Sequence, residues 1–373
     1  MTVFLAVATI PLIIATASAE SGRSDDLLAL AGIIANPASS KDIRRLVAQG
    51  RVVPDWEKVN ILRRVLLGLQ ATGIGQVVAM PDSAHLAERA RDDPELSLDL
   101  KVLPMPVRYS EADTVEAAQR MGELAVDCLV TLGGDGTNRA VARGCASIPM
   151  VAISTGTNNV FPVMTEGTLA GLAAGLVAQK SVDLSQGLIT SKTLEIWVDG
   201  QYKDLALVDV AFSRERFVGT RAIWDLGTLY EVFLTRAEPA SIGLSSVGAR
   251  LAPVSLADPG GLHYVLSETG ESGSGQRRGL GDTPPAQGAM VVLAPIAPGA
   301  VRWVPIQSWE LVPEDTSVML PAGRHCTVAL DGERAFSVMP QQQVAVAVRR
   351  NGPPVVQVEA VLRQAAVQGL FRS

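Results

Sequence analysis

Residues 130–138 (VTLGGDGTN) constrain this chain more than any other segment. An apolar run ends in three glycines that enclose one aspartate, and a segment of helical character follows. This order predicts a buried strand, a tight turn and the N-terminus of a helix. Glycine lets backbone N–H groups approach an anion closely, and a helix N-terminus attracts negative charge. The segment therefore predicts a phosphate-binding turn in an α/β fold.

The aspartate inside this turn, Asp135, suggests the kind of chemistry. A carboxylate is poorly placed there to bind phosphate, but it could hold Mg²⁺ or accept a proton from an attacking hydroxyl. The chain lacks the G-x-x-x-x-G-K-[ST] pattern of P-loop proteins, and the turn lacks the G-x-G-x-x-G spacing of dinucleotide-binding folds. An ordinary glycine-rich turn is the alternative. The complete GGDGT pattern after an apolar strand favours phosphoryl transfer.

The first half of the chain alternates apolar runs with amphipathic segments. Strands are predicted at 27–35, 76–80, 98–103, 128–132 and 149–153, and helices at 55–69, 84–91 and 111–124. This alternation predicts a doubly wound, mostly parallel sheet, which binds ligands at the carboxyl ends of its strands. We place this α/β nucleotide-binding domain at residues 25–160.

From about residue 190 the pattern changes to short β-rich segments separated by glycine and proline. Asp199-Gly200 and Asp331-Gly332 are typical of hairpin turns. The pattern predicts an antiparallel β-rich domain at residues 161–345, which would bind the acceptor. We expect a loop at 267–288, which is polar and glycine-rich. Residues 346–373 are expected to return to the first domain.

Three further positions follow predicted strands or turns and could complete a nucleotide site. Asn36 precedes a proline at the end of the first predicted strand, and Glu333 follows the second hairpin turn. The segment 154–162 offers hydroxyls, amides and a glycine, from Thr155, Gly156, Thr157, Asn158 and Asn159. Each position has a plain structural alternative, which is a polar loop or an ordinary turn.

The GGDGT pattern resembles the signature shared by NAD kinases, diacylglycerol kinases and sphingosine kinases. Longer segments, such as IIANPASSKDIRRLVA, TLGGDGTNR and STGTNNVFP, are similar to the ATP-NAD kinase-like family, in its AcoX branch of acetoin catabolism. The resemblance runs from about Leu28 to the C-terminus. It implies a kinase that uses ATP and Mg²⁺ to phosphorylate a hydroxyl, that of NAD or a related small metabolite. Polyphosphate is the alternative phosphate donor.

The resemblance also implies roles for individual residues. Backbone groups of the turn would hold the phosphates, at Gly133, Gly134, Gly136 and Thr137. The nucleotide would be bound by Asn36 and the polar residues of 155–159. Asp135 and Glu333 would be the catalytic residues and the ligands of Mg²⁺. Asp209 and Arg221 would contact the acceptor, although Arg221 and Asp225 could also form a plain surface ion pair.

One departure from the pattern leaves the acceptor open. NAD kinases carry an asparagine where this chain has Val208, and valine cannot donate the amide hydrogen bonds that hold a ribose or a nicotinamide. Each such loss costs about 1–3 kcal/mol when the partner is buried. Two alternatives therefore stand beside an NAD kinase. One is a nucleotide-binding regulator without transfer activity, and the other is a lipid or sphingoid kinase, which GGDGT together with residues 331–333 (DGE) favours.

Composition argues against some partners. The net charge is −6, with 32 basic and 38 acidic residues mixed along the chain, so no basic stripe for a nucleic acid is evident. An aromatic content of 4% and the lack of a basic patch give little support to membrane contact. The three cysteines are widely spaced and typical of core thiols in a reducing compartment. We expect a cytoplasmic protein without stable membrane association, and a homo-oligomer because relatives of NAD kinase often are.

Residues 1–24 form an apolar N-terminal extension. Residues 1–19 resemble a weak signal peptide, yet they lack a basic segment before the apolar run, and Pro11 interrupts that run. The run is also short for a membrane span. A non-functional extension, a true signal and a buried or surface-lying segment all remain open.

Overall fold

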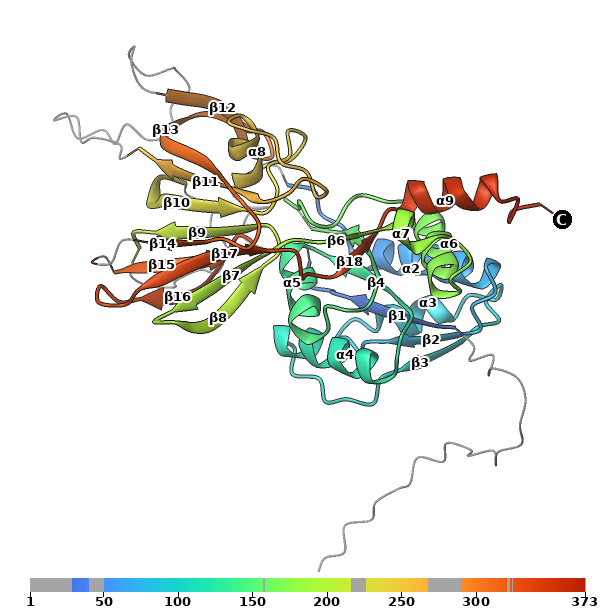
Figure 1. Ribbon diagram of the computed structural model, residues 1–373. Helices are drawn as coiled ribbons and strands as arrows, with labels where there is room; N and C mark the ends of the chain where they lie inside the picture. Colours follow the sequence, from blue (N-terminus) through green and yellow to red (C-terminus); the bar gives the residue numbers. More distant parts are fainter. Residues whose placement is uncertain are drawn as a thin grey trace, which may run out of the picture.

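The computed structural model describes residues 29–39, 50–156, 158–215, 226–267, 290–320, 323 and 325–372. The extension 1–24 and the candidates Thr157 and Arg221 lie outside these residues, as do Asp225 and nearly all of the predicted loop. The described part forms two domains connected by two crossovers, one leading into β7 and one into β18 (Figure 1).

The first domain contains a seven-stranded sheet in the order β3-β2-β1-β4-β5-β18-β6. Its strands are β1 (Leu30–Ala35), β2 (Gln76–Ala79), β3 (Asp99–Val102), β4 (Cys128–Gly133), β5 (Met150–Ser154), β18 (Pro354–Val356) and β6 (Leu188–Thr190). They pair in parallel except β6, which is antiparallel to β18. The predicted doubly wound sheet is confirmed. The sheet and its helices continue to Thr190, beyond the boundary expected at residue 160.

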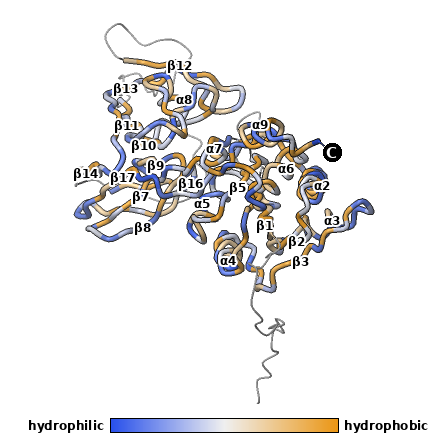
Figure 2. Tube along the Cα trace, turned by 45° about the vertical axis from the view of Figure 1, so that its right-hand side comes forward, coloured by the Kyte–Doolittle hydropathy of each residue, from blue (hydrophilic) through white to orange (hydrophobic). Residues whose placement is uncertain are grey.

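Helices cover both faces of this sheet. One core cluster packs under α2 (Asp55–Ala71), α3 (Leu86–Arg91), α6 (Gly167–Ala178) and α9 (Val358–Val367). A second cluster packs under α4 (Glu111–Glu123) and α5 (Asp135–Gly144). The short α7 (Leu184–Gly187) precedes β6. Figure 2 shows apolar residues along the central strands, as expected for a parallel sheet that is buried on both faces.

The second domain is built from two antiparallel sheets. The larger has the order β12-β13-β11-β10-β9-β15-β16 and the smaller β14-β17-β7-β8. The larger sheet contains β9 (Asp209–Ser213), β10 (Leu229–Leu234), β11 (Gly261–Leu266), β12 (Met290–Ala297), β13 (Ala300–Val312), β15 (Cys326–Leu330) and β16 (Glu333–Val338). The smaller contains β7 (Thr193–Val198), β8 (Gln201–Ala206), β14 (Ser317–Leu320) and β17 (Val344–Arg349). One apolar cluster draws residues from both sheets, and another packs α8 (Leu244–Ala249) on the larger sheet. The predicted antiparallel β-rich domain is confirmed.

The β-rich segment 201–213 is divided between the two sheets. It breaks at Leu207 and Val208, between β8 and β9. The Asp331 carboxylate accepts both N–H groups, at 3.0 and 2.7 Å, so they are removed from the sheet ladders. A distant hairpin therefore redirects the chain from one sheet to the other.

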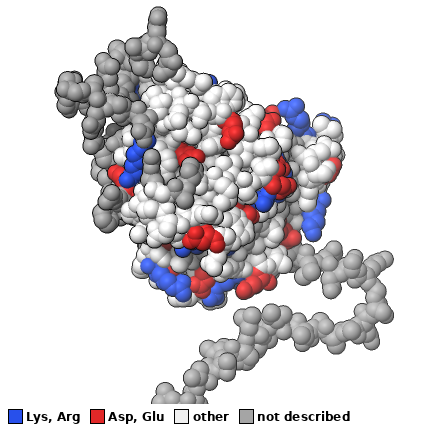
Figure 3. Space-filling model, turned by 60° about the vertical axis from the view of Figure 1, so that its left-hand side comes forward, with Lys and Arg blue, Asp and Glu red and all other residues white. Residues whose placement is uncertain are grey.

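The surface carries both signs of charge. On the face drawn in Figure 3, basic and acidic side chains are interspersed rather than gathered into an area of one sign. Among the described ranges, none of the helices combines the length and apolar character that crossing a bilayer requires.

Candidate functional site

The predicted site segments meet in a cleft of about 590 Å³. The first domain contributes the turn after β1, residues 134–137 at the start of α5, and the loop after β5. The second domain contributes Asp331 and Glu333 from the hairpin between β15 and β16. The carboxyl ends of parallel strands thus face a hairpin of the other domain, which is where an open α/β sheet binds its ligands.

The GGDGT turn begins α5 directly. Gly134 is the N-cap residue of this ten-residue helix and has no side chain to cap it, so among the described residues no N-cap side chain binds the first N–H groups. The fully buried Asn138 braces the turn by donating to the Gly134 carbonyl at 2.8 Å and accepting from the Thr131 hydroxyl at 2.7 Å. A Cβ at Gly136 would lie 3.4 Å from Oε1 of Glu333. The turn is therefore held open toward the cleft, with a carboxylate opposite.

The turn after β1 is tied to the GGDGT turn. Asn36 lines the cleft and donates from Nδ2 to the hydroxyl of Thr137 at 2.9 Å. Lys58 of α2 is fully buried and donates to the carbonyls of Asn36, Pro37 and Ser39 at 2.8–3.1 Å. Lys58 was not predicted from the sequence. Its place on the buried side of α2 beside Val59 was a usable signal, because a buried lysine needs several acceptors.

The loop after β5 contributes the polar wall of the cleft. Gly156, Asn158 and Asn159 line it, whereas Thr155 is buried behind it, with its Oγ1 2.7 Å from the Ser39 hydroxyl. Asn159 is fixed by donating to the Ser154 hydroxyl at 2.7 Å. Within the described residues, the buried Oδ1 of Asn158 has no hydrogen-bond partner. An acceptor left open in this position can receive an N–H or O–H from a ligand.

Asp135 is a buried acid on the wall of the cleft. Its Oδ1 accepts the backbone N–H groups of Phe161 at 2.8 Å and Val160 at 3.1 Å. Burial raises the pKa of this carboxyl to about 7, and the nearby Asp331 adds to the rise. The two backbone donors and the charge of Arg236 oppose it. A carboxyl with a pKa near neutrality can both accept and release a proton at physiological pH.

The β15–β16 hairpin uses one acid for structure and presents another to the cleft. Asp331 accepts the N–H groups that break the strand at Leu207 and Val208, and burial raises its pKa to about 6. Glu333 is half-buried and lines the cleft. Asp209 does not line it, because it lies behind the hairpin and accepts from Gly332 at 3.2 Å. The predicted acceptor contact of Asp209 therefore stays a prediction without support from its position.

The described lining of the cleft is acidic. It has six carboxylates and neither lysine nor arginine, the acids being Asp82, Glu111, Asp113, Asp135, Asp331 and Glu333. Asp82 is used locally, since it accepts the N–H groups of Ala84 and Leu86 at 2.8 and 3.0 Å. In the part of the chain that the structure describes, no group of three or more His, Cys, Asp or Glu side chains could hold a metal ion. A polyphosphate would therefore bind to this acidic lining together with a cation that neutralises its charge.

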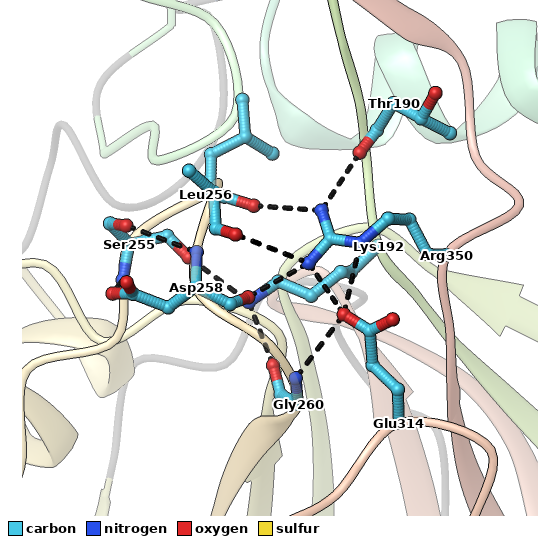
Figure 4. Close-up of polar contacts among 9 residues, drawn as sticks. Thr190, Lys192, Ser255, Leu256, Asp258, Gly260, Glu314 and Arg350 are labelled. Carbon is cyan, nitrogen blue, oxygen red and sulfur yellow. Dashed lines mark hydrogen bonds and ion pairs between the residues drawn. The ribbon is translucent and has the colours of Figure 1, made fainter.

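A cluster around the buried Lys192 and the half-buried Arg350 ties the crossovers between the domains to the segment 255–260 (Figure 4). Lys192 donates to the carbonyls of Ser255, Asp258 and Gly260 at 2.7–3.0 Å. Arg350 pairs with Glu314 and donates to further carbonyls, those of Thr190, Leu256, Ala257 and Asp258. Burial, followed by the charge of Arg350, lowers the pKa of Lys192 to about 8. Neither cation was predicted from the sequence.

Comparisons with known proteins agree with this two-part architecture. Residues 31–181 match the ATP-NAD kinase N-terminal domain, and residues 192–351 match the acetoin catabolism protein X C-terminal domain. Acetoin catabolism protein X of Cupriavidus necator is 37% identical over 365 residues, which cover 95% of this chain and 97% of that protein.

Solved structures with a similar fold include two kinases. Yeast NADH kinase complexed with NADH has a TM-score of 0.51 at 16% identity, with 93% of this chain and 89% of that chain covered. A diacylglycerol kinase from Bacillus anthracis has a TM-score of 0.41 at 14% identity, with 89% and 98% covered. The predicted NAD kinase-like fold is confirmed. Because the 37% identity extends over nearly the whole of both proteins, the chain belongs to the acetoin catabolism protein X family.

Proposed function

We propose that this protein is a kinase-type phosphotransferase that moves the γ-phosphoryl group of ATP to the hydroxyl of a small metabolite. The observation that carries the proposal is the convergence of three loop segments and Glu333 on one cleft. The N–H groups at the start of α5, which no N-cap side chain binds in the described part of the chain, suit phosphate oxygens, as does the turn after β1. The Oδ1 of Asn158, which lacks a partner among the described residues, suits a donor of a base or ribose.

The acidity of the cleft supports a requirement for Mg²⁺. Carboxylate oxygens suit this ion, which is commonly bound by one or two carboxylates together with the phosphates of its substrate. Glu333 would hold it as part of a magnesium–nucleotide complex, which leaves Asp135, the other ligand expected from the sequence, to act as the base. When bound, Mg²⁺ would neutralise the phosphate charges that the acidic lining would otherwise repel.

Asp135 is suited to handle the proton of the reaction. As the acceptor oxygen forms its bond to the γ-phosphorus, the bond from that phosphorus to the bridging oxygen breaks and ADP leaves. The hydroxyl proton passes to the Asp135 carboxylate, whose pKa of about 7 matches this exchange near neutral pH. The N–H groups of Val160 and Phe161 hold the carboxylate in place during the transfer.

The acceptor is a small hydroxyl compound, with NAD as the first candidate because of the resemblance to NAD kinases. Val208 bears on this assignment. It is fully buried in the core cluster beneath α4 and α5 and does not line the cleft. An asparagine-like contact from this position is therefore missing, which favours a metabolite that needs fewer amide hydrogen bonds than NAD. The wide apolar cleft of a lipid kinase has no counterpart among the mostly polar lining residues.

Incubation of the full chain with ATP, Mg²⁺ and NAD tests the proposal, with NADP measured by a cycling dehydrogenase and ADP by a coupled assay. We expect ADP formation that depends on an added hydroxyl compound and falls by about a thousandfold or more in Asp135→Asn. NADP would identify NAD as the acceptor. The alternative, a nucleotide-binding regulator without transfer activity, would be supported by a different result. In that case the protein binds ATP, but neither NAD nor any of a panel of small alcohols and sugars causes ADP to form.

A further inference from the structure

A second cavity, of about 800 Å³, lies between β5, β18, α6 and α9. It shares no lining residue with the cleft. The two sites nevertheless meet at one short segment, because the Phe161 N–H binds Asp135 of the cleft while Phe161 itself lines the second cavity. We refer to the second cavity as the α6–α9 groove.

One wall of the α6–α9 groove is apolar and exposed. Val163, Met164 and Leu169 are 59%, 76% and 45% exposed, whereas other lining residues, such as Val151 and Phe161, are buried in the core. Further lining comes from aliphatic side chains, those of Leu256, Val355, Val356, Val358 and Leu362. Exposed apolar side chains gathered at a cavity mark a binding surface more often than scattered ones do.

Arg236 supplies a buried cation to this apolar groove. It lines the cavity and is only 5% exposed. Its guanidinium lies 4.8 Å from the centre of the Phe161 ring. Nη1 makes one long hydrogen bond, 3.4 Å to the Val160 carbonyl, and in the described part of the chain Nη2 has no partner. A buried guanidinium with an open donor is costly unless an acceptor completes it.

The other charged residues of the groove already have partners. Glu166 accepts the N–H groups of Thr168 and Leu169 at the start of α6 and pairs with Arg64 at 3.3 Å. Glu359 and Arg363 form an ion pair along α9 at 2.7 Å. Arg236, by contrast, forms no ion pair with any residue in the described ranges. Burial lowers the pKa of Arg236, and the charges of Asp135, Glu238 and Asp331 partly offset that lowering. The groove therefore combines an apolar wall with one guanidinium nitrogen that lacks a hydrogen-bond partner among the described residues.

We propose that the α6–α9 groove binds an aliphatic monocarboxylate, with the carboxylate on Arg236 and the chain along the apolar wall. Guanidinium and carboxylate match in shape and charge, and their hydrogen bonds are stronger than neutral ones. A phosphate dianion fits less well, because the second guanidinium of the groove, that of Arg363, is already paired with Glu359, and Glu166 adds a further negative charge at the rim. A neutral apolar ligand would leave Nη2 unpartnered.

A ligand bound in the groove would be connected to Asp135 of the cleft through a short segment of the chain. Residues 160 and 161 provide the physical connection, since they contact both Arg236 and Asp135.

Isothermal titration of the full chain with butanoate, hexanoate and octanoate tests the proposal, with hexanol as the uncharged probe. We expect saturable binding that tightens about fourfold for each added methylene, the increment of burying one CH₂ group. Hexanol should bind at least about tenfold more weakly than hexanoate, because it cannot make the charged hydrogen bonds. Absence of binding by all three carboxylates, or equal binding of hexanol, overturns the proposal.

Two variants locate the binding. Val163→Glu places a negative charge in the exposed apolar wall and should abolish hexanoate binding, while Val367→Glu, at an 83% exposed position of α9 outside the groove, should not change it. Arg236→Gln should weaken hexanoate about ten- to a hundredfold and leave hexanol unchanged. If Val163→Glu converts a dimer to a monomer in sedimentation and hexanoate binding is unaffected, the groove is an interface between copies of this chain and the proposal is wrong.

Discussion

The substitution Asp135→Asn should change how the stability of the protein depends on pH. The carboxyl is buried beside Asp331, and these two causes raise its pKa from an ordinary 3.8 to about 7. Asparagine has nearly the same shape and can still accept the N–H of Phe161, but it does not titrate. The variant thus removes one buried titration with little change in packing.

The sign and size of the effect follow from the two pKa values. The folded protein holds this proton more tightly than the unfolded chain, so its stabilising effect is complete below pH 3.8 and is lost as the pH rises through 7. About three pKa units at 1.36 kcal/mol each amount to about 4 kcal/mol, of which about 3 kcal/mol falls between pH 5 and pH 8.

Equilibrium unfolding in urea at pH 5, 6, 7 and 8, followed by circular dichroism, measures this difference. The free energy of unfolding of the wild type, relative to that of Asp135→Asn, should fall by about 3 kcal/mol from pH 5 to pH 8. Asp92→Asn, at a side chain that is 72% exposed, controls for the loss of one charge. Parallel curves for the wild type and Asp135→Asn would refute the argument that burial dominates the electrostatics of this carboxyl.

Three further substitutions test packing and electrostatics elsewhere. Lys58→Met leaves three half-buried carbonyls without their donor, and should lower the free energy of unfolding by about 2–4 kcal/mol and weaken ATP binding. The exposed Lys101→Met should do neither, and equal effects of the two variants in urea unfolding and calorimetry would contradict the role of Lys58. Gly171→Ala places a methyl group against the backbone of α2 and should lower the free energy of unfolding by at least about 2 kcal/mol. Gly75→Ala, with open space around its Cβ, should be tolerated. Similar melting temperatures of the two variants would refute the close contact of α2 with α6. Burial lowers the pKa of His263, but hydrogen bonds to Glu231 and Glu310 outweigh it and raise the pKa, so this stabilisation is present below pH 6.5 and is lost above it. The melting temperature of the wild type should therefore fall more steeply from pH 6 to pH 9 than that of His263→Gln. Parallel profiles would exclude a stabilising interaction of His263 with the two glutamates.

The parallel half of the fold was predictable because its signals are local. Each buried strand is a continuous apolar run, and residues 133–137 mark a turn that few other structures require. The glycine- and asparagine-rich loop segments could be assigned to one cleft because parallel strands end at the same sheet edge. Helix α6 escaped prediction for the opposite reason, since it is buried on nearly all sides and shows no amphipathic period.

Features of the site that depend on contacts between distant segments could not be inferred from the sequence. The position of Val208 in the core and of Asp209 behind a hairpin results from hydrogen bonds to Asp331, more than a hundred residues away. The interdomain cluster around Lys192 likewise brings together three separated segments. Arg236 carries no sequence signal of its own, because only the fold places its guanidinium beside Phe161 without an ion-pair partner among the described residues.

The central claim is that the cleft at the GGDGT turn binds a magnesium nucleotide, and calorimetric titration with ATP tests it most directly. The wild type should bind ATP with Mg²⁺ and bind it at least about tenfold more weakly in EDTA, because the cleft is acidic. Gly136→Val, which fills the space before Glu333, should abolish binding, and Gly75→Val should not. Binding that is indifferent to both Mg²⁺ and Gly136→Val would contradict the account.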